Sequence, residues 1–174
     1  AVSAVEQHLI RTKKRTAVSI ILESAEPRDV HHFATLLGFG ARAIYPYLAH
    51  EAIKESIDKK LLDKDFYVAV DDYNFAILHG IVKIASKMGI STLQSYQSAQ
   101  IFEIIGIKKS VVDKYFTNTV SRVEGIGLEE MDEGVKWRHS HAFDPLGLGV
   151  DTTLDSSGAH NLRSGNDKDD HLYN

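Results

Sequence analysis

The sequence of 174 residues contains no cysteine. This absence excludes disulfides, thiolate nucleophiles, cysteine-ligated zinc and cysteine-ligated iron–sulfur clusters from the chain. Long hydrophobic runs are also missing: residues 17–22 fall far short of the ~20 apolar residues that span a bilayer, so no membrane partner is expected. Positive charge is not in excess either, since 20 Lys and Arg stand against 24 Asp and Glu, a net charge of -4. Nucleic acid is therefore not an expected partner.

What is present is ordinary globular composition, with 43% hydrophobic and 25% charged residues. The length suits about one domain with a single modest core. No charged segment followed by an apolar segment opens the chain, which predicts a cytoplasmic location. The chain starts at Ala1 rather than Met and ends in a polar stretch at Asn174, so we expect it to be a piece of a longer polypeptide.

The first part of the sequence predicts a βαβ unit. A helix is expected over residues 1–14, and its apolar face consists of Val2, Val5, Leu9 and Ile10. Residues 17–22 form a β-branched apolar run that predicts a buried strand, and residues 41–45 predict a second strand. The helix between them has Ser24 as a candidate N-cap, Pro27 in its first turn, and Gly38 and Gly40 at its end. Its predicted inward side chains are Val30, Phe33, Ala34 and Leu37. A parallel sheet is expected.

Short helices dominate the prediction for the rest of the chain. Helices are expected over 48–57, 99–105, 110–116 with Ser110 as N-cap, and 128–141. A longer helix is expected over 66–88, where Phe66, Val70, Tyr73, Ile77, Ile81, Ile84 and Met88 recur every three or four residues as a core-facing stripe. Residues 61–65, 90–96 and 117–127 are expected to be a polar connection, a semi-extended piece and a loop.

These elements predict an α/β chain with partial parallel-sheet βα units, a helix-rich second half and an irregular C-terminal tail. Residues 144–174 are rich in Gly and Asp and contain few large apolar side chains, a composition typical of linkers. The compact body is therefore predicted to end near Phe143.

Short catalytic motifs give little support to any reaction. Gly38 and Gly40 lack the third glycine of a dinucleotide-binding loop, and the sequence has neither a P-loop nor a serine nucleophile elbow. His31 and His32 are adjacent, so on a helix they project about 100° apart and do not readily share a metal ion. We expect one of these histidines to be hydrogen-bonded and the other to lie at the surface. Asp71-Asp72 is expected to be a solvated helix face.

Two polar segments are candidate binding loops. Residues 87–96 follow a predicted helix end and contain Lys87, Ser91 and Thr92, while residues 117–127 place Arg122 among small residues. These four side chains are the candidates for binding an anion. The alternative is that both segments are structural loops, because Ser and Thr commonly satisfy their own backbone. No catalytic or metal-binding residue is predicted.

Several longer segments form one ordered set along the chain. They are 26–34 (EPRDVHHFA), 36–40 (LLGFG), 46–49 (PYLA), 86–96 (SKMGISTLQSY), 100–103 (QIFE), 113–117 (DKYFT), 121–122 (SR), 125–128 (GIGL), 162–165 (LRSG) and 171–174 (HLYN). In this order they resemble the central region of the large chain of glutamate synthase, with the tail resembling the passage toward its flavin domain. The resemblance covers nearly the whole chain.

Some positions depart from the pattern of that family. Tyr45 stands where the family usually has Asn, and Gln97-Ser98 stands where it has Arg-Gly. Asn118 and Glu124 each stand where it has Gly. Such replacements cost backbone freedom wherever the glycine has a positive φ.

The resemblance implies a multidomain oxidoreductase that hydrolyses glutamine, passes ammonia through a tunnel and makes glutamate from 2-oxoglutarate at an FMN. It implies electrons delivered through an iron–sulfur cluster, from ferredoxin or from a nicotinamide-dependent small chain. In that family the glutaminase nucleophile and the cluster ligands are cysteines, which this sequence lacks. Residues 1–143 would then be the C-terminal part of the central domain, and 144–174 a linker toward the FMN-binding barrel, with no cofactor in this segment.

Two hypotheses about function follow. In the first, the chain is an architectural part of glutamate synthase whose partners are the amidotransferase and FMN-binding domains of the same polypeptide. In the second, it is a free-standing α/β module that binds a small anion through Lys87, Ser91, Thr92 and Arg122, without catalysis.

Overall fold

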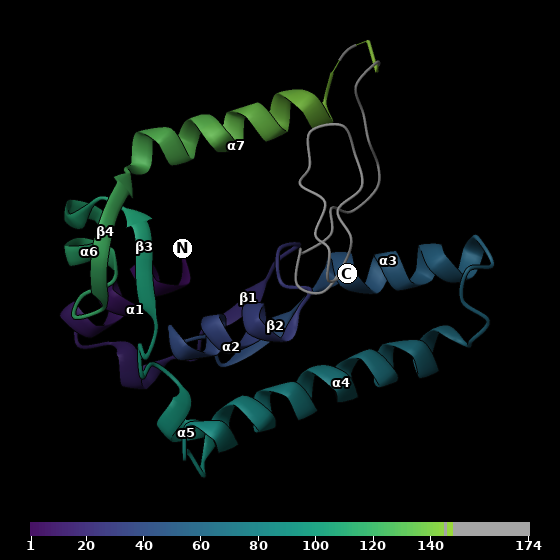
Figure 1. Cartoon of the computed structure of the whole chain (residues 1–174), viewed down its shortest axis with the longest axis horizontal. Coiled ribbons are helices and arrows are strands. Elements are labelled where there is room, and N and C mark those ends of the chain that lie inside the picture. The colour runs from purple at the N-terminus through teal and green to yellow at the C-terminus, as the bar shows by residue number, and fades with distance from the viewer. Residues whose placement is uncertain (145, 148–174) are drawn as a thin grey trace, which may run out of the picture. The chain divides into compact units, whose positions relative to one another are not determined.

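The computed structural model describes residues 1–144 and 146–147. The chain divides into two compact units, of which the first is Ala1–Gly127 and the second begins at Leu128 (Figure 1). In order, the elements are α1 (Val2–Arg11), the 3₁₀ helix η1 (Arg15–Ala17), β1 (Ile21–Glu23), α2 (Val30–Gly38), β2 (Ala43–Tyr45), α3 (Tyr47–Asp58), α4 (Phe66–Lys87), α5 (Leu93–Tyr96), β3 (Glu103–Ile107), α6 (Lys109–Tyr115), β4 (Val120–Ile126) and α7 (Leu128–Ala142). The predicted α/β class is confirmed.

The first sheet is the predicted βαβ unit. Strands β1 and β2 are parallel, with Leu22 opposite Ile44, and α2 connects them. β1 begins later than predicted because residues 15–17 form η1 instead of extended backbone. The predicted burial of this strand is wrong: Ile21 is 73% exposed. Within the described residues β1 pairs only with β2, so nothing covers its outer side chains.

Helix α2 begins at a different signal from the one predicted. Its N-cap is Asp29 rather than Ser24. The Nδ1 atom of His32 accepts hydrogen bonds from the backbone N–H groups of Arg28 and Asp29, at 3.2 and 3.3 Å, which satisfies donors just before the helix. His31 is exposed. The prediction of one hydrogen-bonded and one surface histidine is therefore confirmed.

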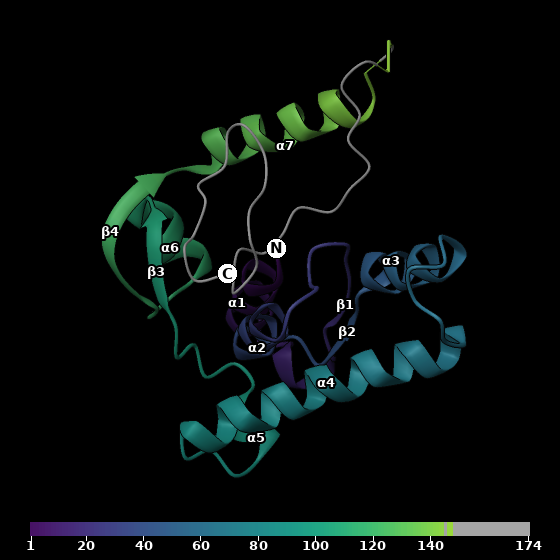
Figure 2. The ribbon, with the colours of Figure 1, turned by 45° about the vertical axis from the view of Figure 1, so that its right-hand side comes forward.

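Helix α4 packs against α2 and α3, and Figure 2 shows α2 lying directly over it. Asp65 starts α4, because its carboxylate accepts from the backbone N–H of Tyr67 at 2.9 Å and of Val68 at 3.2 Å. The predicted stripe lies on the packed side, where Ile77 is 8% exposed, although Met88 at its end is 46% exposed. Gly80 allows close contact, since an added Cβ would lie 2.5 Å from a methyl group of Val30.

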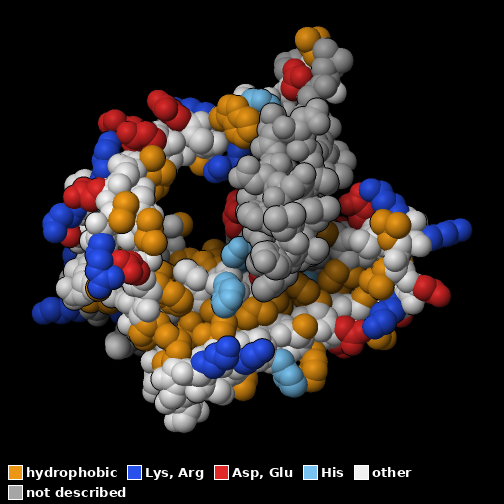
Figure 3. Space-filling view, viewed as in Figure 1, with side chains coloured by type: hydrophobic (Ala, Val, Ile, Leu, Met, Phe, Trp, Pro, Cys, Tyr) orange, Lys and Arg blue, Asp and Glu red, His pale blue; other side chains and the backbone are white. Residues whose placement is uncertain are grey.

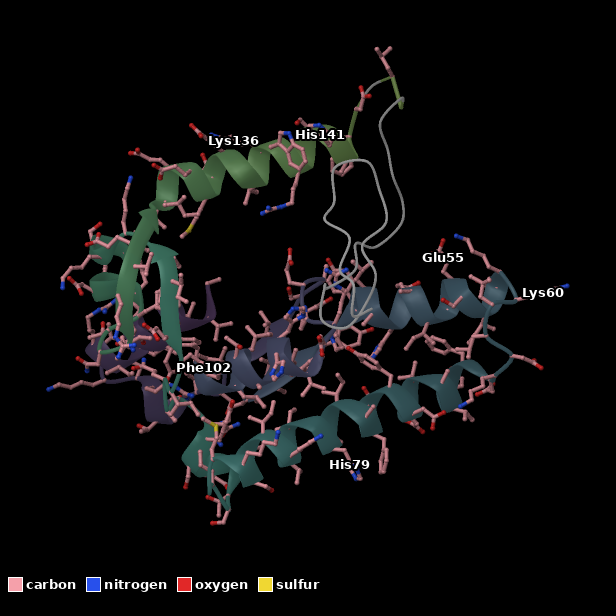
Figure 4. All side chains as sticks on the ribbon, in the orientation of Figure 1. Glu55, Lys60, His79, Phe102, Lys136 and His141 are labelled. Atoms are coloured by element: carbon pink, nitrogen blue, oxygen red, sulfur yellow. The ribbon has the colours of Figure 1, made fainter. Side chains whose placement is uncertain are left out.

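The core of the first unit forms where α2, α4 and α5 meet. Its buried members are Ala34, Leu37 and Tyr96, and partly buried apolar side chains such as Ile81 and Phe102 pack around them. Residues 93–96 were expected to be semi-extended but form α5, which places Tyr96 at 0% exposure. Figure 4 shows Phe102 near the end of α2, where Gly38 leaves room for its ring.

Tyr73 connects α4 to the segment just before α2, and its raised pKa predicts how stability depends on pH. Its hydroxyl donates to the carbonyl oxygen of Arg28 at 3.0 Å. Burial, and to a smaller extent the charge of Asp29, raises the pKa of Tyr73 from 10.0 to about 12. The unfolded chain then loses this proton at a lower pH than the native chain, so the contribution to stability is complete below pH 10.0 and is lost toward pH 12.

The measurement is urea unfolding of the protein and of Tyr73→Phe at a series of pH values above neutrality. We expect the free energy of unfolding of the parent protein to fall more steeply with rising alkaline pH than that of the variant. The raised pKa of the buried Tyr96 hydroxyl is common to both proteins and cancels in the comparison. Parallel pH profiles would contradict the assignment to Tyr73.

The second sheet corrects two predictions. Residues 99–105 were expected to be helical and 117–127 a loop, but β3 and β4 form a parallel pair connected by α6. The pairing is irregular, with register shifts on either side of Ile105. Gly125 permits it, because an added Cβ would lie 2.4 Å from the carbonyl oxygen of Gly106. The helix predicted at 110–116 is α6, but its N-cap is Lys108 rather than Ser110.

In the second unit the described structure is mainly α7. The predicted helix over 128–141 is confirmed, and no residue of α7 is buried. Most of the predicted linker, 144–174, lies outside the described residues, and the boundary near Phe143 stays a prediction. Among the helices that the structure describes, none is long and apolar enough to cross a bilayer.

Candidate functional site

Helix α1 turns its polar side toward the protein. The residues that it buries are Val2, Ser3, Glu6 and Gln7, whereas Val5 and Ile10 of the predicted apolar face are each 48% exposed. The spacing 2, 3, 6, 7 is that of a helical face, so the whole buried face is shifted from the one that apolar residues predicted. Two uncommon interior residues, a carboxylate and an amide, are thereby placed inside the first unit.

The buried carboxylate of Glu6 is held by two side chains that come from different segments of the chain. Glu6 is 2% exposed and forms an ion pair with the Nε of Arg15, just after α1. The hydroxyl of Ser98 donates to Glu6 Oε1 at 2.9 Å. Arg15 in turn donates through Nη1 to the carbonyl oxygen of Val18 at 3.0 Å and through Nη2 to that of Gly40 at 3.3 Å. The buried carboxylate of Glu6 is therefore both paired with a cation and hydrogen-bonded, as a buried charge requires.

Two hollows adjoin Glu6. The first has a volume of about 420 Å³ and is lined by η1, the residues before β1, and Arg42. The second, called the α1–α6 groove, has a volume of about 540 Å³ and is lined mainly by Gln7, Arg11, Ser98, Gln100, Asp113 and Asn118. Such volumes suit a small molecule. All of these residues belong to the first unit.

The backbone beside the α1–α6 groove is left-handed at three side-chain-bearing residues. Ser98, Gln100 and Asn118 have φ values of 61, 52 and 67°. Ser98 and Asn118 are two of the positions where glutamate synthases are expected to carry glycine, and a positive φ explains that preference. Glu124, the third such position, lies within β4 and accepts from the N–H of Lys109 at 3.0 Å, at the start of α6.

The residues predicted to bind an anion come from two separate parts of the chain. Lys87, Ser91 and Thr92 are exposed at the end of α4 and in the loop after it, and Thr92 Oγ1 is 2.8 Å from Ser95 Oγ. Arg122 lies on β4, where its Nη1 donates to both carboxylate oxygens of Glu103 at 2.9 and 3.0 Å. A carboxylate of the chain thus already occupies this guanidinium, and the anion site stays a prediction.

Sequence reasoning missed the buried Glu6 and its partners. Periodicity assigns Glu6 to the solvated side of α1, and nothing local marks Arg15 or Ser98 as its partners. Positions 2, 3, 6 and 7 of α1 are mostly polar. This pattern by itself indicates a solvated face, so it could not have identified Glu6 as a buried residue. Within the described part of the chain, no three His, Asp or Glu side chains are placed to hold a metal ion. A cysteine-ligated cluster does not fit a chain without cysteine.

The parallel βα units place the chain in the α/β class of proteins. The family model described as glutamate synthase central domain matches residues 1–108. The chain belongs to this family.

Individual relatives agree with the family match. The chain is 53% identical over 143 residues to the NADPH glutamate synthase large chain of Bacillus subtilis, a match covering 82% of this chain and 9% of the relative. It is 40% identical over 174 residues to the NADH glutamate synthase of Saccharomyces cerevisiae, covering 95% of this chain and 8% of that protein. It is 39% identical over 175 residues to the ferredoxin-dependent glutamate synthase 2 of Synechocystis, covering 95% and 11%. The chain therefore spans about a tenth of the length of these relatives.

Proposed function

We propose that this chain is an architectural part of a glutamate synthase, holding the amidotransferase and FMN-binding domains in register around an ammonia tunnel. Residues 1–143 form the C-terminal part of the central domain and residues 144–174 connect toward the FMN-binding barrel. The parent would make glutamate from glutamine and 2-oxoglutarate in the cytoplasm. FMN and the iron–sulfur cluster would be bound by other domains. The electron donor would be ferredoxin or a nicotinamide-dependent small chain.

The observation that carries the proposal is the large apolar surface of the first unit. On α4, Tyr67, Val68, Phe75, Leu78 and Val82 are 51 to 76% exposed. They lie apart from the stripe that packs on α2, and Figure 4 shows His79 on the side of α4 away from α2. Single exposed apolar residues are normal on a protein surface, but five on one side of a helix, interrupted by Asp71, mark an interaction site.

A second apolar surface lies on β3 and β4. Ile105, Val120 and Val123 are 70, 52 and 54% exposed, and Figure 3 shows hydrophobic side chains over these strands. A two-stranded parallel sheet is rarely left open, because parallel sheets are normally covered on both faces. These surfaces are suited to contact neighbouring domains of a polypeptide about ten times longer than the chain.

The first test is the activity of the purified chain alone. We expect no glutaminase activity, no glutamate synthase activity and no bound flavin, since the nucleophile and cluster ligands of the family are cysteines. Flavin absorbance in the preparation, or turnover of either reaction, would overturn the architectural assignment. Binding of 2-oxoglutarate that is lost in Lys87→Gln would instead support the anion-binding module.

The second test places the chain in an enzyme. Residues 1–143 replace the matching segment in the Bacillus subtilis large chain, and glutamate formed per glutamine hydrolysed is measured. We expect Leu78→Asp to lower this ratio while glutaminase activity and circular dichroism are retained, because domain register is lost. The matched control is Asn74→Asp on the same helix, which is exposed and lies beside the apolar face. An unchanged ratio in Leu78→Asp contradicts the proposal.

A further inference from the structure

Helix α4 is apolar on two opposite sides. Its inner side packs against α2 and α3 and contains Ile77 and Ile81. On its outer side Phe75 and Val82 are 60 and 63% exposed, and Figure 4 shows His79 there as well. A helix that is apolar on both sides is normally buried on both. Within the first unit, the outer side of α4 therefore lacks the cover that such a helix normally has.

The outer side has the spacing of a contact between two helices. Val68, Asp71, Phe75, Leu78 and Val82 are all exposed and follow one another at intervals of three, four, three and four residues. We call these five residues the outer seam of α4. Side chains at such intervals form a narrow stripe along which two helices pack. The seam extends over 14 residues, or about 21 Å at 1.5 Å per residue. The partner that fits this stripe is another helix of similar length.

The charges on α4 determine which helix fits and how it runs. Asp71 lies in the seam near the start of α4, and Lys83 and Lys87 are exposed near its end. Asp72 adjoins the seam but is paired with Lys64 at 2.5 Å, so Asp71 is the acidic group that a partner would meet. A polar residue within such a seam fixes the register of the pair. Helices favour acidic residues near their start and basic residues near their end, and such a helix complements α4 when it runs antiparallel.

We propose that the outer seam of α4 binds an amphipathic helix of a neighbouring domain of the parent polypeptide. This helix runs antiparallel to α4 and places a lysine or arginine opposite Asp71. The inference rests on the proposed architectural function, since its partner is one of the domains that the chain would hold in register. The Bacillus subtilis relative is about ten times longer than the match, which leaves ample sequence for such a helix.

The first test uses the chimera of residues 1–143 in the Bacillus subtilis large chain. Hydrogen exchange measured by mass spectrometry is compared between the chimera and its Leu78→Asp variant. We expect exchange to become at least about tenfold faster in one stretch of about 15 or more residues outside the inserted segment. This stretch should have apolar residues at intervals of three and four, and Asn74→Asp should leave its exchange unchanged. Faster exchange only in stretches without this period, or in none, would overturn the proposal.

This measurement separates the helical partner from the architectural function. If Leu78→Asp lowers glutamate formed per glutamine hydrolysed but no helical stretch exchanges faster, the architectural function stands and the helical partner is wrong. If neither quantity changes, both proposals are wrong. If a helical stretch exchanges faster while the ratio is unchanged, the partner is correct but the contact does not maintain domain register.

The second test determines the orientation of the partner. The chain has no cysteine, so Ser86→Cys adds a single thiol at an exposed position beside the end of the seam. The probe is a synthetic 22-residue helix with leucine at seam spacing, glutamates in its first half, lysines in its second half, and a cysteine at one end. We expect at least about fivefold more disulfide with the peptide whose cysteine is N-terminal. Combining Asp71→Lys with Lys83→Glu should reverse this preference. Equal yields from the two peptides would contradict the antiparallel orientation.

A second copy of the chain is the other occupant to exclude, because α4 has the same arrangement of charges as the proposed partner. Sedimentation of the full chain at increasing concentration measures self-association. We expect Leu78→Asp to leave the sedimentation of the chain unchanged, since the partner belongs to another domain. A dimer that Leu78→Asp dissociates and Asn74→Asp does not would assign the seam to a second copy and overturn the proposal.

Discussion

Replacing Gly40 with alanine is expected to lower the free energy of unfolding by about 3 kcal/mol. The added Cβ atom would both strain the backbone and collide with a buried side chain. Gly40 has a φ of +112°, a conformation that side-chain-bearing residues rarely adopt. An added Cβ would also lie 2.5 Å from Oε2 of Glu6, a buried side chain. The new methyl group would therefore push the carboxylate away from Arg15 as well as strain the backbone. Urea unfolding followed by circular dichroism measures the loss.

Gly89 provides a control in which an added methyl group strains the backbone but collides with nothing. It also has a positive φ, +70°, but an added Cβ there would meet nothing within 4 Å. Gly89→Ala is therefore expected to cost only the backbone strain, about 1 kcal/mol. The difference between the two variants therefore combines the collision with Glu6 and the greater strain of a φ of +112°, which lies outside the left-handed region open to residues with a side chain. If both variants lose the same stability, the carboxylate moves aside freely and the Glu6 network is not rigid.

The first βαβ unit and α4 could be predicted because their signals are local and repeated. The stripe of α4 recurs over six turns, and every additional turn makes the helical period harder to imitate by chance. β1 illustrates the limit of such signals. Its apolar run identified a strand, but its burial depends on which elements lie beside it, and among the described residues only β2 does.

The second sheet could not be predicted because its signals are ambiguous. Residues 103–107 form a short apolar run, and a run of this length fits a buried strand or a helix turn equally well. Gly106 follows the helix predicted over 99–105, where a glycine is typical of a helix end, but its φ of +80° belongs to an irregular strand. The need for glycine at position 125 comes from the carbonyl group of Gly106, which approaches it closely across the sheet. A contact between residues 19 positions apart leaves no periodic trace in the sequence.

The same reasoning explains why the candidate site was missed. Glu6, Arg15 and Ser98 come together only because the fold places α1 beside the chain leaving α5. Each residue alone is typical of a surface, and the apolar residues of α1 predict that a neighbouring face of the helix, shifted from the buried one, lies inward. The family resemblance identified the segments but not this network, since the motifs that carry it begin at residue 26.

Breaking the ion pair between Glu6 and Arg15 is the second change with a large expected effect. Arg15→Met keeps much of the apolar stem but leaves the carboxylate of Glu6, 3% exposed, without its cation. Removing one partner of a buried pair costs about 3–5 kcal/mol. Because the Arg15 side chain is 17% exposed, solvent reaches part of the pair, and we expect about 3 kcal/mol, the lower end of that range. Urea unfolding at neutral pH measures it.

A double-mutant cycle distinguishes the pair from simple loss of packing. Glu6→Gln removes the charge but keeps an acceptor for Ser98, so the double variant should be more stable than the sum of the single losses predicts. The coupling energy should be about 1–3 kcal/mol. The matched control is the exposed pair of Lys64 and Asp72, whose side chains are 48 and 58% exposed and whose coupling should stay below about 1 kcal/mol. Equal coupling energies in the two cycles would mean that solvent reaches the carboxylate of Glu6. In that case the positive φ values of Gly40 and Ser98 would not be explained by the need to enclose this carboxylate.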